Sequence, residues 1–223
     1  MAIESTSLLG LERTNLRQQA VVALRQAITS GEIPAGTHLA ETDLSQRLQI
    51  SRGTLREALR ELQQQGLVTS GARGRLSVRK LAPTEIQDIF VVRGALESLA
   101  AQLLVEGDTT QAVTQLTAAV ERMADAATFG LEKRIEADLE FHRTLCALTG
   151  NATLLTSWQA LEGSIRMSIM YGGVDRAVEN MDVGRHSEIV DAIATGDSDR
   201  ARETIMAHMG EASGNLVRRN QVA

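Results

Sequence analysis

The chain has 223 residues, more than one ordinary domain, so two modest domains with separate cores are expected. Aromatic residues make up only 2% of the chain and prolines number two, which favours packed helices and argues against a mainly β fold. The formal net charge of −5 would, on its own, argue against nucleic acid as a partner.

Cysteine usage and hydropathy limit the possible locations of the protein. The lone Cys146 excludes an internal disulfide bond. The N-terminal segment has neither a basic region nor a long apolar run, so we expect no signal peptide. No stretch approaches the roughly 20 apolar residues that a membrane-spanning helix needs. We therefore expect a cytoplasmic protein without a membrane partner.

The charge is unevenly distributed along the chain. Residues 1–80 contain 11 Lys and Arg against 7 Asp and Glu, whereas residues 81–223 contain 12 against 21. A basic head on an acidic body is typical of a DNA-contacting domain joined to a sensing or dimerising domain.

The N-terminal part has the pattern of a small helical domain with a hairpin. Apolar periodicity, a Ser51 cap and glycine breakers predict three helices, at 14–30, 42–48 and 51–65. Two short alternating runs around the glycine-rich tip 70–74 predict a β-hairpin. The sequence therefore predicts a winged helix-turn-helix domain over 1–81, with about the first ten residues disordered.

The C-terminal part is helical almost throughout. Pro83 marks the boundary, and short glycine-containing separators keep successive helices antiparallel. We expect an antiparallel bundle of about six helices over 82–223, near 84–106, 109–127, 131–149, 152–170, 177–195 and 198–219. The whole chain is thus predicted to be mostly α.

Candidate DNA-binding residues follow from the helix-turn-helix. Arg52, Thr54 and Arg56 lie at the N-terminal end of the second helix of the motif, the end that enters the major groove. Arg60, one turn on, is expected to meet a phosphate. At the hairpin tip, Arg73-Gly74 is suited to the minor groove or a phosphate. The alternative is a solvated basic face without a partner.

Candidate metal ligands lie in the C-terminal part. Asp138 and His142 are four residues apart and project from the same apolar helix face, while His186 and His208 lie on the inner stripes of two later helices. A carboxylate on a core-facing stripe is costly unless it is paired or coordinated. Three imidazoles and one carboxylate suit Zn, Ni, Mn or Fe. The alternative is that each histidine is an ordinary core residue or a helix-end charge.

The run ETDLSQRLQISRGTLREALRELQQQGLV, followed by a glycine-tipped hairpin, resembles the GntR family of bacterial regulators. The resemblance implies a homodimer on palindromic double-stranded DNA, with Arg52 and Arg56 as base readers and Arg73-Gly74 as wing contacts. Thr42 departs from the arginine that relatives often carry there, so operator sequence or affinity is expected to differ.

The runs DLEFH, TGN, HSEI and HM resemble the FCD ligand-binding domain of the FadR-like branch of that family. The resemblance implies that one divalent metal ion is held by Asp138, His142, His186 and His208. With six helices rather than seven, the domain resembles the vanillate-regulator subgroup more than the acyl-CoA-binding subgroup. Relatives commonly respond to organic acids, so Arg93 and Asn151 are candidate effector contacts. The alternative role of Arg93 is a helix pair with Glu97, and that of Asn151 is a helix cap.

These observations predict a regulator, most simply a repressor, whose operator affinity changes when a small carboxylate binds at the metal ion. A metalloenzyme is the first alternative, because an ion with open positions can activate water. The sequence lacks a hydrolase signature such as H-E-x-x-H, so we expect no enzyme. The second alternative is a DNA-binding protein with a purely structural or metal-sensing site.

Overall fold

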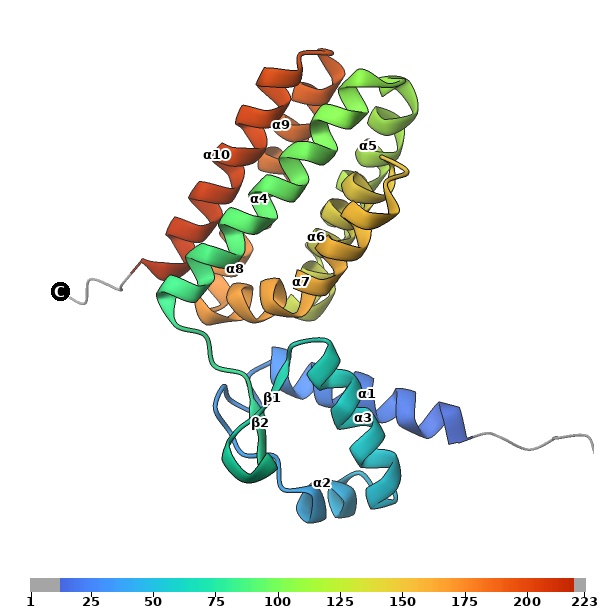
Figure 1. The fold of residues 1–223 in the computed structure, drawn as a ribbon, viewed down its shortest axis with the longest axis vertical. Coiled ribbons are helices and arrows are strands. Elements are labelled where there is room, and N and C mark those ends of the chain that lie inside the picture. Colours follow the sequence, from blue (N-terminus) through green and yellow to red (C-terminus); the bar gives the residue numbers. More distant parts are fainter. Residues whose placement is uncertain (1–12, 219–223) are drawn as a thin grey trace, which may run out of the picture. The chain divides into compact units, whose positions relative to one another are not determined.

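The computed structural model describes residues 13–218, and the chain divides after Arg79 into two compact units (Figure 1). The expectation of disorder in about the first ten residues concerns a segment outside the described residues. Within residues 13–218, no helix combines the length and apolar character that a membrane crossing requires.

The N-terminal unit is a winged helix-turn-helix, built from three helices, a short hairpin and a 3₁₀ turn: α1 (Arg13–Thr29), α2 (Glu41–Arg47), α3 (Arg52–Gln64), β1 (Val68–Ser70), η1 (Ala72–Gly74) and β2 (Leu76–Val78). Its core forms because α1 and α3 turn their apolar stripes toward each other, burying Leu24, Ile28, Leu55, Leu59 and Leu62. That packing leaves the opposite face of α3 in solvent.

The hairpin pairs β1 with β2 in antiparallel register, with Val68 opposite Val78. A third segment extends it, since His38 forms an isolated bridge with Ser77 and the Leu39 amide donates to the Leu76 carbonyl at 2.9 Å. The sequence did not predict this segment, because it is too short to show alternation between Pro34-Ala35-Gly36 and α2.

The C-terminal unit is an all-helical bundle: α4 (Pro83–Glu106), α5 (Thr109–Ala126), α6 (Leu131–Ala147), α7 (Ala152–Tyr171), α8 (Val174–Asn180), α9 (Val183–Ala194) and α10 (Ser198–Val217). Helices α4 and α10 pack along each other, α5 packs on α6 and α9, and α7 packs on α4 and α6 (Figure 1). The inner faces of α4, α6, α9 and α10 therefore line one common core.

One stretch of the bundle differs from the sequence prediction. The single helix expected over 177–195 is two helices, α8 and α9, so residues 80–218 contain seven helices. The chain breaks at Met181 (φ −90°, ψ 21°), and the Asp182 side chain then caps α9 by accepting from the Arg185 amide at 3.2 Å. The resemblance to the vanillate-regulator subgroup rested on an expected count of six helices. The seven helices over residues 80–218 remove that basis.

Candidate metal centre and nucleic-acid interface

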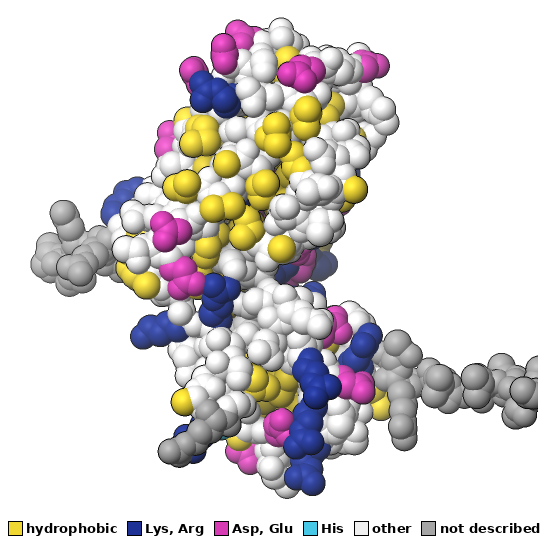
Figure 2. All heavy atoms as spheres, viewed as in Figure 1, with side chains coloured by type: hydrophobic (Ala, Val, Ile, Leu, Met, Phe, Trp, Pro, Cys, Tyr) yellow, Lys and Arg dark blue, Asp and Glu magenta, His cyan; other side chains and the backbone are white. Residues whose placement is uncertain are grey.

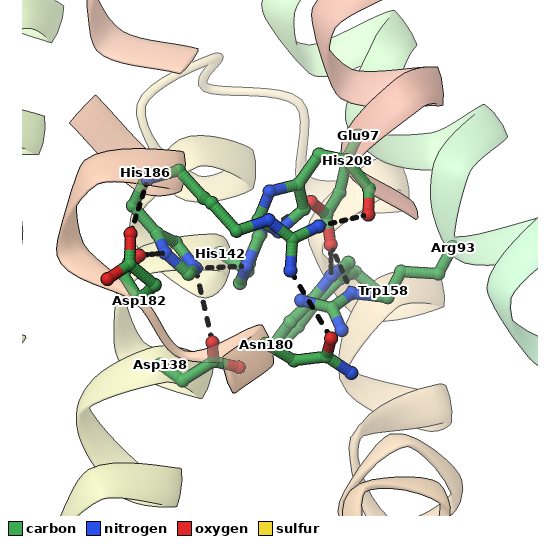
Figure 3. Close-up of polar contacts among 10 residues, drawn as sticks. Arg93, Glu97, Asp138, His142, Trp158, Asn180, Asp182, His186 and His208 are labelled. Atoms are coloured by element: carbon green, nitrogen blue, oxygen red, sulfur yellow. Dashed lines mark hydrogen bonds and ion pairs between the residues drawn. The ribbon is translucent and has the colours of Figure 1, made fainter. Parts of the chain in front are cut away.

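Three histidines from three helices meet in the core of the bundle. His142 comes from α6, His186 from α9 and His208 from α10, and one ring nitrogen of each lies within 4.8 Å of the others (Figure 3). All three are buried. Each lies on the inner stripe of its helix, as the apolar periodicity predicts, and the edge of the Phe141 ring packs against two of them.

Hydrogen bonds fix how two of these rings are turned. His186 Nδ1 lies 2.7 Å from the Asp182 carbonyl oxygen, which can only accept, so Nδ1 carries the proton and donates. His142 Nδ1 lies 2.6 Å from Glu97 Oε2 and donates to that carboxylate. Both Nε2 atoms are then bare lone pairs, and they face each other at 3.2 Å.

Asp138 adds a fourth electron-rich group to the same place. Its Oδ1 lies 3.1 Å from His186 Nε2, although the carboxylate is not part of the compact group formed by the three histidines. Lone pairs that face one another in a dry core repel unless a cation lies between them. The chemistry of this donor set therefore fits a metal ion, with the three imidazoles as its centre and Asp138 at its edge.

The protonation states of the site suit metal ligands. Burial lowers the pKa of His142 and of His208 well below 6.5; Arg93 contributes next for His142, and the neighbouring histidines for His208. Burial opposes ionisation of Asp138, but the close polar contact with His186, followed by His142 and Arg93, outweighs it and lowers the pKa of the carboxyl group. At neutral pH, His142 and His208 are thus neutral imidazoles and Asp138 is a carboxylate, and all three lie around His186.

Glu97, which the sequence reading treated only as a helix partner of Arg93, is central to the site. It is fully buried, and besides orienting His142 its Oε1 accepts from Arg93 Nε at 2.7 Å and from Trp158 Nε1 at 2.8 Å. Metal-binding histidines usually donate their second ring nitrogen to such a carboxylate. The available signal was the occurrence of Arg93 and Glu97 in an apolar run, VVRGALESLA.

Arg93 and Asn151 occupy different environments. Arg93 is buried beside Glu97, yet its Nη2 has no hydrogen-bond partner among the described residues. Asn151 is exposed and caps α7, its Oδ1 accepting from the Leu154 amide at 3.1 Å. The described contacts join Arg93 to the histidine site through Glu97 and give Asn151 the role of a helix cap.

The α9–α10 side of the site is held by another arginine. Arg185 Nη2 donates to the His208 carbonyl oxygen at 3.2 Å, and its Nη1 donates to Asn180 Oδ1 at the same distance. These bonds fix the backbone that carries His208, while the ring Nδ1 of His208 is buried without a partner in residues 13–218. An unsatisfied imidazole nitrogen of this kind is available to a ligand.

The N-terminal unit presents a basic helix face. Arg52, Arg56 and Arg60 recur every four residues along α3 and are exposed, so they share one side of the helix. Figure 2 shows Lys and Arg side chains gathered in a column on this unit, where Figure 1 draws α3. No hydrogen bond or ion pair holds Arg52 or Arg60 within the described part of the chain.

The other candidate DNA contacts are more constrained. Arg56 Nε pairs with Glu41 Oε2 on α2 at 2.6 Å. Thr54 belongs to the helix cap, because its amide donates to Ser51 Oγ at 3.1 Å and the two hydroxyls lie 2.9 Å apart. Arg73 lies in η1, and Gly74 follows it with φ +71°, a backbone conformation that favours glycine at the hairpin tip.

Comparison with known families accounts for both units. Residues 16–78 match the bacterial regulatory proteins of the gntR family, and residues 88–211 match the FCD domain. The chain is a GntR-family regulator with an FCD domain. GntR-family regulators bind operator DNA, and the proteins that this regulator resembles are transcriptional regulators, not enzymes.

Individual relatives match the regulator over most of its length. It is 28% identical to the "Probable D-xylose utilization operon transcriptional repressor" of Paenarthrobacter nicotinovorans, covering 89% of this chain and 88% of that one. The gluconate operon transcriptional repressor of Bacillus licheniformis is 25% identical, covering 92% and 87%. A GntR regulator of known structure from Rhodococcus sp. RHA1 has the same fold, with a TM-score of 0.73 at 21% identity over 91% of this chain and 97% of that one.

Proposed function

We propose that this regulator is a repressor that binds a palindromic operator as a homodimer, and that a small carboxylate bound at a metal ion in its FCD domain changes its operator affinity. The observation that carries the proposal is the convergence of His142 Nε2, His186 Nε2 and Asp138 Oδ1, three acceptors separated by 3.2 and 3.1 Å in a buried site. A metal cation between these atoms would remove the repulsion of their lone pairs.

The operator is read from α3. Arg52 and Arg60 are exposed and unpaired among the described residues, so they are available to DNA without breaking existing contacts. Arg52, next to the Ser51 cap, contacts a base edge, for which a two-pronged arginine–guanine contact contributes about 1–3 kcal/mol of discrimination. Arg60 contacts a phosphate, and Arg73-Gly74 contacts the neighbouring groove. Arg56 has to exchange Glu41 for its DNA partner.

The metal ion is held by His142, His186 and His208 with Asp138, and Zn, Ni, Mn and Fe are all compatible with these donors. When bound, the ion supplies positive charge and open positions that the oxygens of a carboxylate effector can fill. Glu97 and the Asp182 carbonyl keep the two Nε2 lone pairs directed inward.

Arg93 is the second anchor for the effector. Its guanidinium is buried, one nitrogen is satisfied by Glu97, and Nη2 has no partner within residues 13–218. An unsatisfied buried donor costs about 1–3 kcal/mol, which a carboxylate oxygen would recover. The pair Arg93 and Glu97 thereby connects the effector to His142.

The complete burial of His142 and His186 supports a second candidate function. A closed site surrounded by core side chains also suits a structural ion, or an ion that is itself the signal. The two candidates differ in one property: an effector site must admit a carboxylate, whereas a structural site must not.

Fluorescence anisotropy on DNA from the regulator's own promoter region tests the proposal. At moderate salt, we expect competitor-resistant binding by two copies per site and a change in affinity with Zn²⁺ plus a panel of small carboxylates. Arg52→Ala should abolish selectivity, whereas Arg122→Ala on α5, an equal loss of charge on an exposed residue, should not. Absence of selective binding under every condition would overturn the proposal.

Asp138→Ala separates the two candidates for the metal site. Retained folding with loss of the carboxylate response supports sensing, because Asp138 then affects effector binding at an ion with open positions and is not needed for the fold. Global unfolding of the variant supports a structural ion. A melting temperature of the wild-type protein that no tested carboxylate changes supports the same conclusion.

A further inference from the structure

Arg185, the third residue of α9, lies between the histidine site and solvent. Its guanidinium donates to the backbone carbonyl oxygen of His208, and His186 is its neighbour in the chain. The side chain of Arg185 is 19% exposed, whereas His142 and His186 are completely buried. Arg185 therefore has a charged group that contacts the site and also reaches water.

The present partners of Arg185 compensate its charge poorly. Two of them are uncharged acceptors, the His208 carbonyl oxygen and Asn180 Oδ1, each at 3.2 Å. The third is the carboxylate of Glu211 at 3.3 Å, which is 70% exposed, so water screens its charge. Charge-assisted hydrogen bonds are normally shorter, at about 2.7–2.9 Å. The guanidinium is thus held loosely and can exchange Glu211 for a better-placed anion.

The balance of charge around the histidines also favours an anion at this position. Arg93 and Arg185 are positive, and Glu97 and Asp138 are negative, so these four side chains cancel. A divalent ion bound by the histidines would then leave an excess of two positive charges in a region with little water. An effector with one carboxylate removes half of this excess, and an effector with two carboxylates removes all of it.

The charge of Arg185 acts on the proposed metal ligands themselves. Burial is the main cause of the lowered pKa of His142 and of His208, and the positive charge of Arg185 contributes to both shifts. His208, whose backbone Arg185 holds, also has a buried Nδ1 without a hydrogen-bond partner among residues 13–218. An anion beside the His208 ring would therefore lie close to the guanidinium.

We propose that Arg185 is a specificity-determining residue of the effector site and selects small dicarboxylates. One carboxylate of the effector is bound by the metal ion and Arg93, and the second replaces Glu211 as the acidic partner of Arg185. A guanidinium binds a carboxylate through two parallel N–H donors, so a dicarboxylate held at the site competes well with an exposed glutamate. The inference rests on the proposed function and names the chemical class of its effector.

Isothermal titration calorimetry of the full-length, Zn²⁺-loaded regulator near neutral pH tests the inference. The ligands are malonate, succinate, glutarate and adipate, each compared with its own monoamide, which has nearly the same size and one negative charge fewer. Because the second carboxylate makes charge-assisted hydrogen bonds that an amide cannot replace, we expect at least one dicarboxylate to bind about 10-fold more tightly than its monoamide.

Arg185→Gln should remove this preference. Dicarboxylate affinity should fall about 10-fold, while monoamide affinity should stay unchanged, because the monoamide has no second carboxylate. Arg143→Gln is the matched control. Arg143 also adjoins a proposed ligand, His142, but it pairs with Glu162 on α7 at 3.0 Å, so the same loss of charge there should leave the preference intact.

Glu211→Gln gives a readout that a merely structural role of Arg185 would not produce. The substitution removes the carboxylate that competes with the effector, so dicarboxylates should bind about 2- to 5-fold more tightly than to the wild type, and monoamides should not. Because the Glu211 side chain is 70% exposed, the fold does not depend on it. The variant therefore keeps the inference testable even if Arg185→Gln does not fold.

Equal affinity of each dicarboxylate and its monoamide for the wild type would overturn the inference and leave a monocarboxylate sensor standing. A preference that is unchanged in Arg185→Gln, or in Glu211→Gln where Arg185→Gln does not fold, would overturn it as well. If no carboxylate binds the Zn²⁺-loaded regulator and none changes its operator affinity, effector sensing in the proposed function fails together with the inference.

Discussion

Glu97 Oε2 lies 2.6 Å from His142 Nδ1, and both side chains are completely buried. The other carboxylate oxygen already accepts from Arg93 and Trp158, so all three neighbours of Glu97 are donors. A carboxylate satisfies this arrangement because it only accepts. The contact therefore sets which nitrogen of His142 has a lone pair.

Glu97→Gln should reverse that tautomer. The amide can offer one oxygen to Arg93 and Trp158, but its NH₂ group then faces His142 Nδ1, which must become the acceptor and move its proton to Nε2. We expect metal affinity to fall about 10–100-fold, measured by competition with a chromophoric chelator. Glu136→Gln, in a partly exposed pair with Arg166, is the matched control and should bind as the wild type does. Equal affinity of both variants would contradict the role assigned to Glu97.

The single tryptophan reports on the same site. Trp158 is buried and donates to Glu97, so binding of Zn²⁺ at the histidines should change its emission. The change should saturate at one ion per chain and disappear in Glu97→Gln. A saturating metal titration that leaves the emission unaltered would mean that the ion binds elsewhere.

His186→Ala should weaken metal binding more than Glu97→Gln does. It removes a proposed central ligand and the contact between His186 Nε2 and Asp138 Oδ1, whereas Glu97 acts through another residue. His38→Ala removes an exposed histidine of the N-terminal unit and should leave the metal content unchanged. Inductively coupled plasma mass spectrometry after dialysis measures both. Equal metal content in the two variants would exclude the histidine site.

The metal-free protein should lose stability in mild acid. Since the pKa values of His142 and His208 are lowered by burial, the unfolded chain takes up their protons first as pH falls below about 6.5. Each histidine then contributes a loss of about 1 kcal/mol per pH unit until its folded pKa is reached. The lowered pKa of Asp138 adds a loss only below about pH 4.

Urea unfolding at pH 7, 6 and 5 measures this dependence. His208→Gln, which does not titrate, should have a shallower slope between pH 6.5 and 5 than the wild type. A slope that is unchanged by this substitution would show that His208 does not take part in the acid sensitivity.

Two arginines of α3 should have separable effects on DNA. Arg52→Ala should cost about 1–3 kcal/mol on the operator and little on unrelated DNA, because it removes a base contact. Arg60→Ala should weaken binding on all sequences alike and reduce the slope of log affinity against log salt by about 1. Anisotropy titrations at several salt concentrations measure both, and identical salt and sequence profiles would refute the division.

Where local signals were strong, the sequence predicted the fold closely. Ser51 as a cap and Gly66 as a breaker gave α3, and the apolar stripes gave the inward direction of His142, His186 and His208. The division between α8 and α9 was missed because Met181 continues a helical apolar pattern, and only the cap of Asp182 reveals the break.

The parts of the site that the sequence could not supply depend on contacts between helices. The proton positions of His142 and His186 follow from Glu97 on α4 and the Asp182 carbonyl, and neither contact has a signature in spacing. Asp138 lies against His186 rather than inside the compact histidine group, a distinction of a few ångströms that periodicity does not resolve.

On α4, Arg93 and Glu97 point into the core while Val91, Ala95 and Leu99 point out of it. A single helix thus separates the histidine cluster from the outer surface of the bundle. Under the proposed function, an anion that binds at the cluster and tilts α4 moves the outer face of the same helix, without a relay of intermediate residues. In the proposed sensor, α4 itself therefore carries the signal from the buried cluster to the surface.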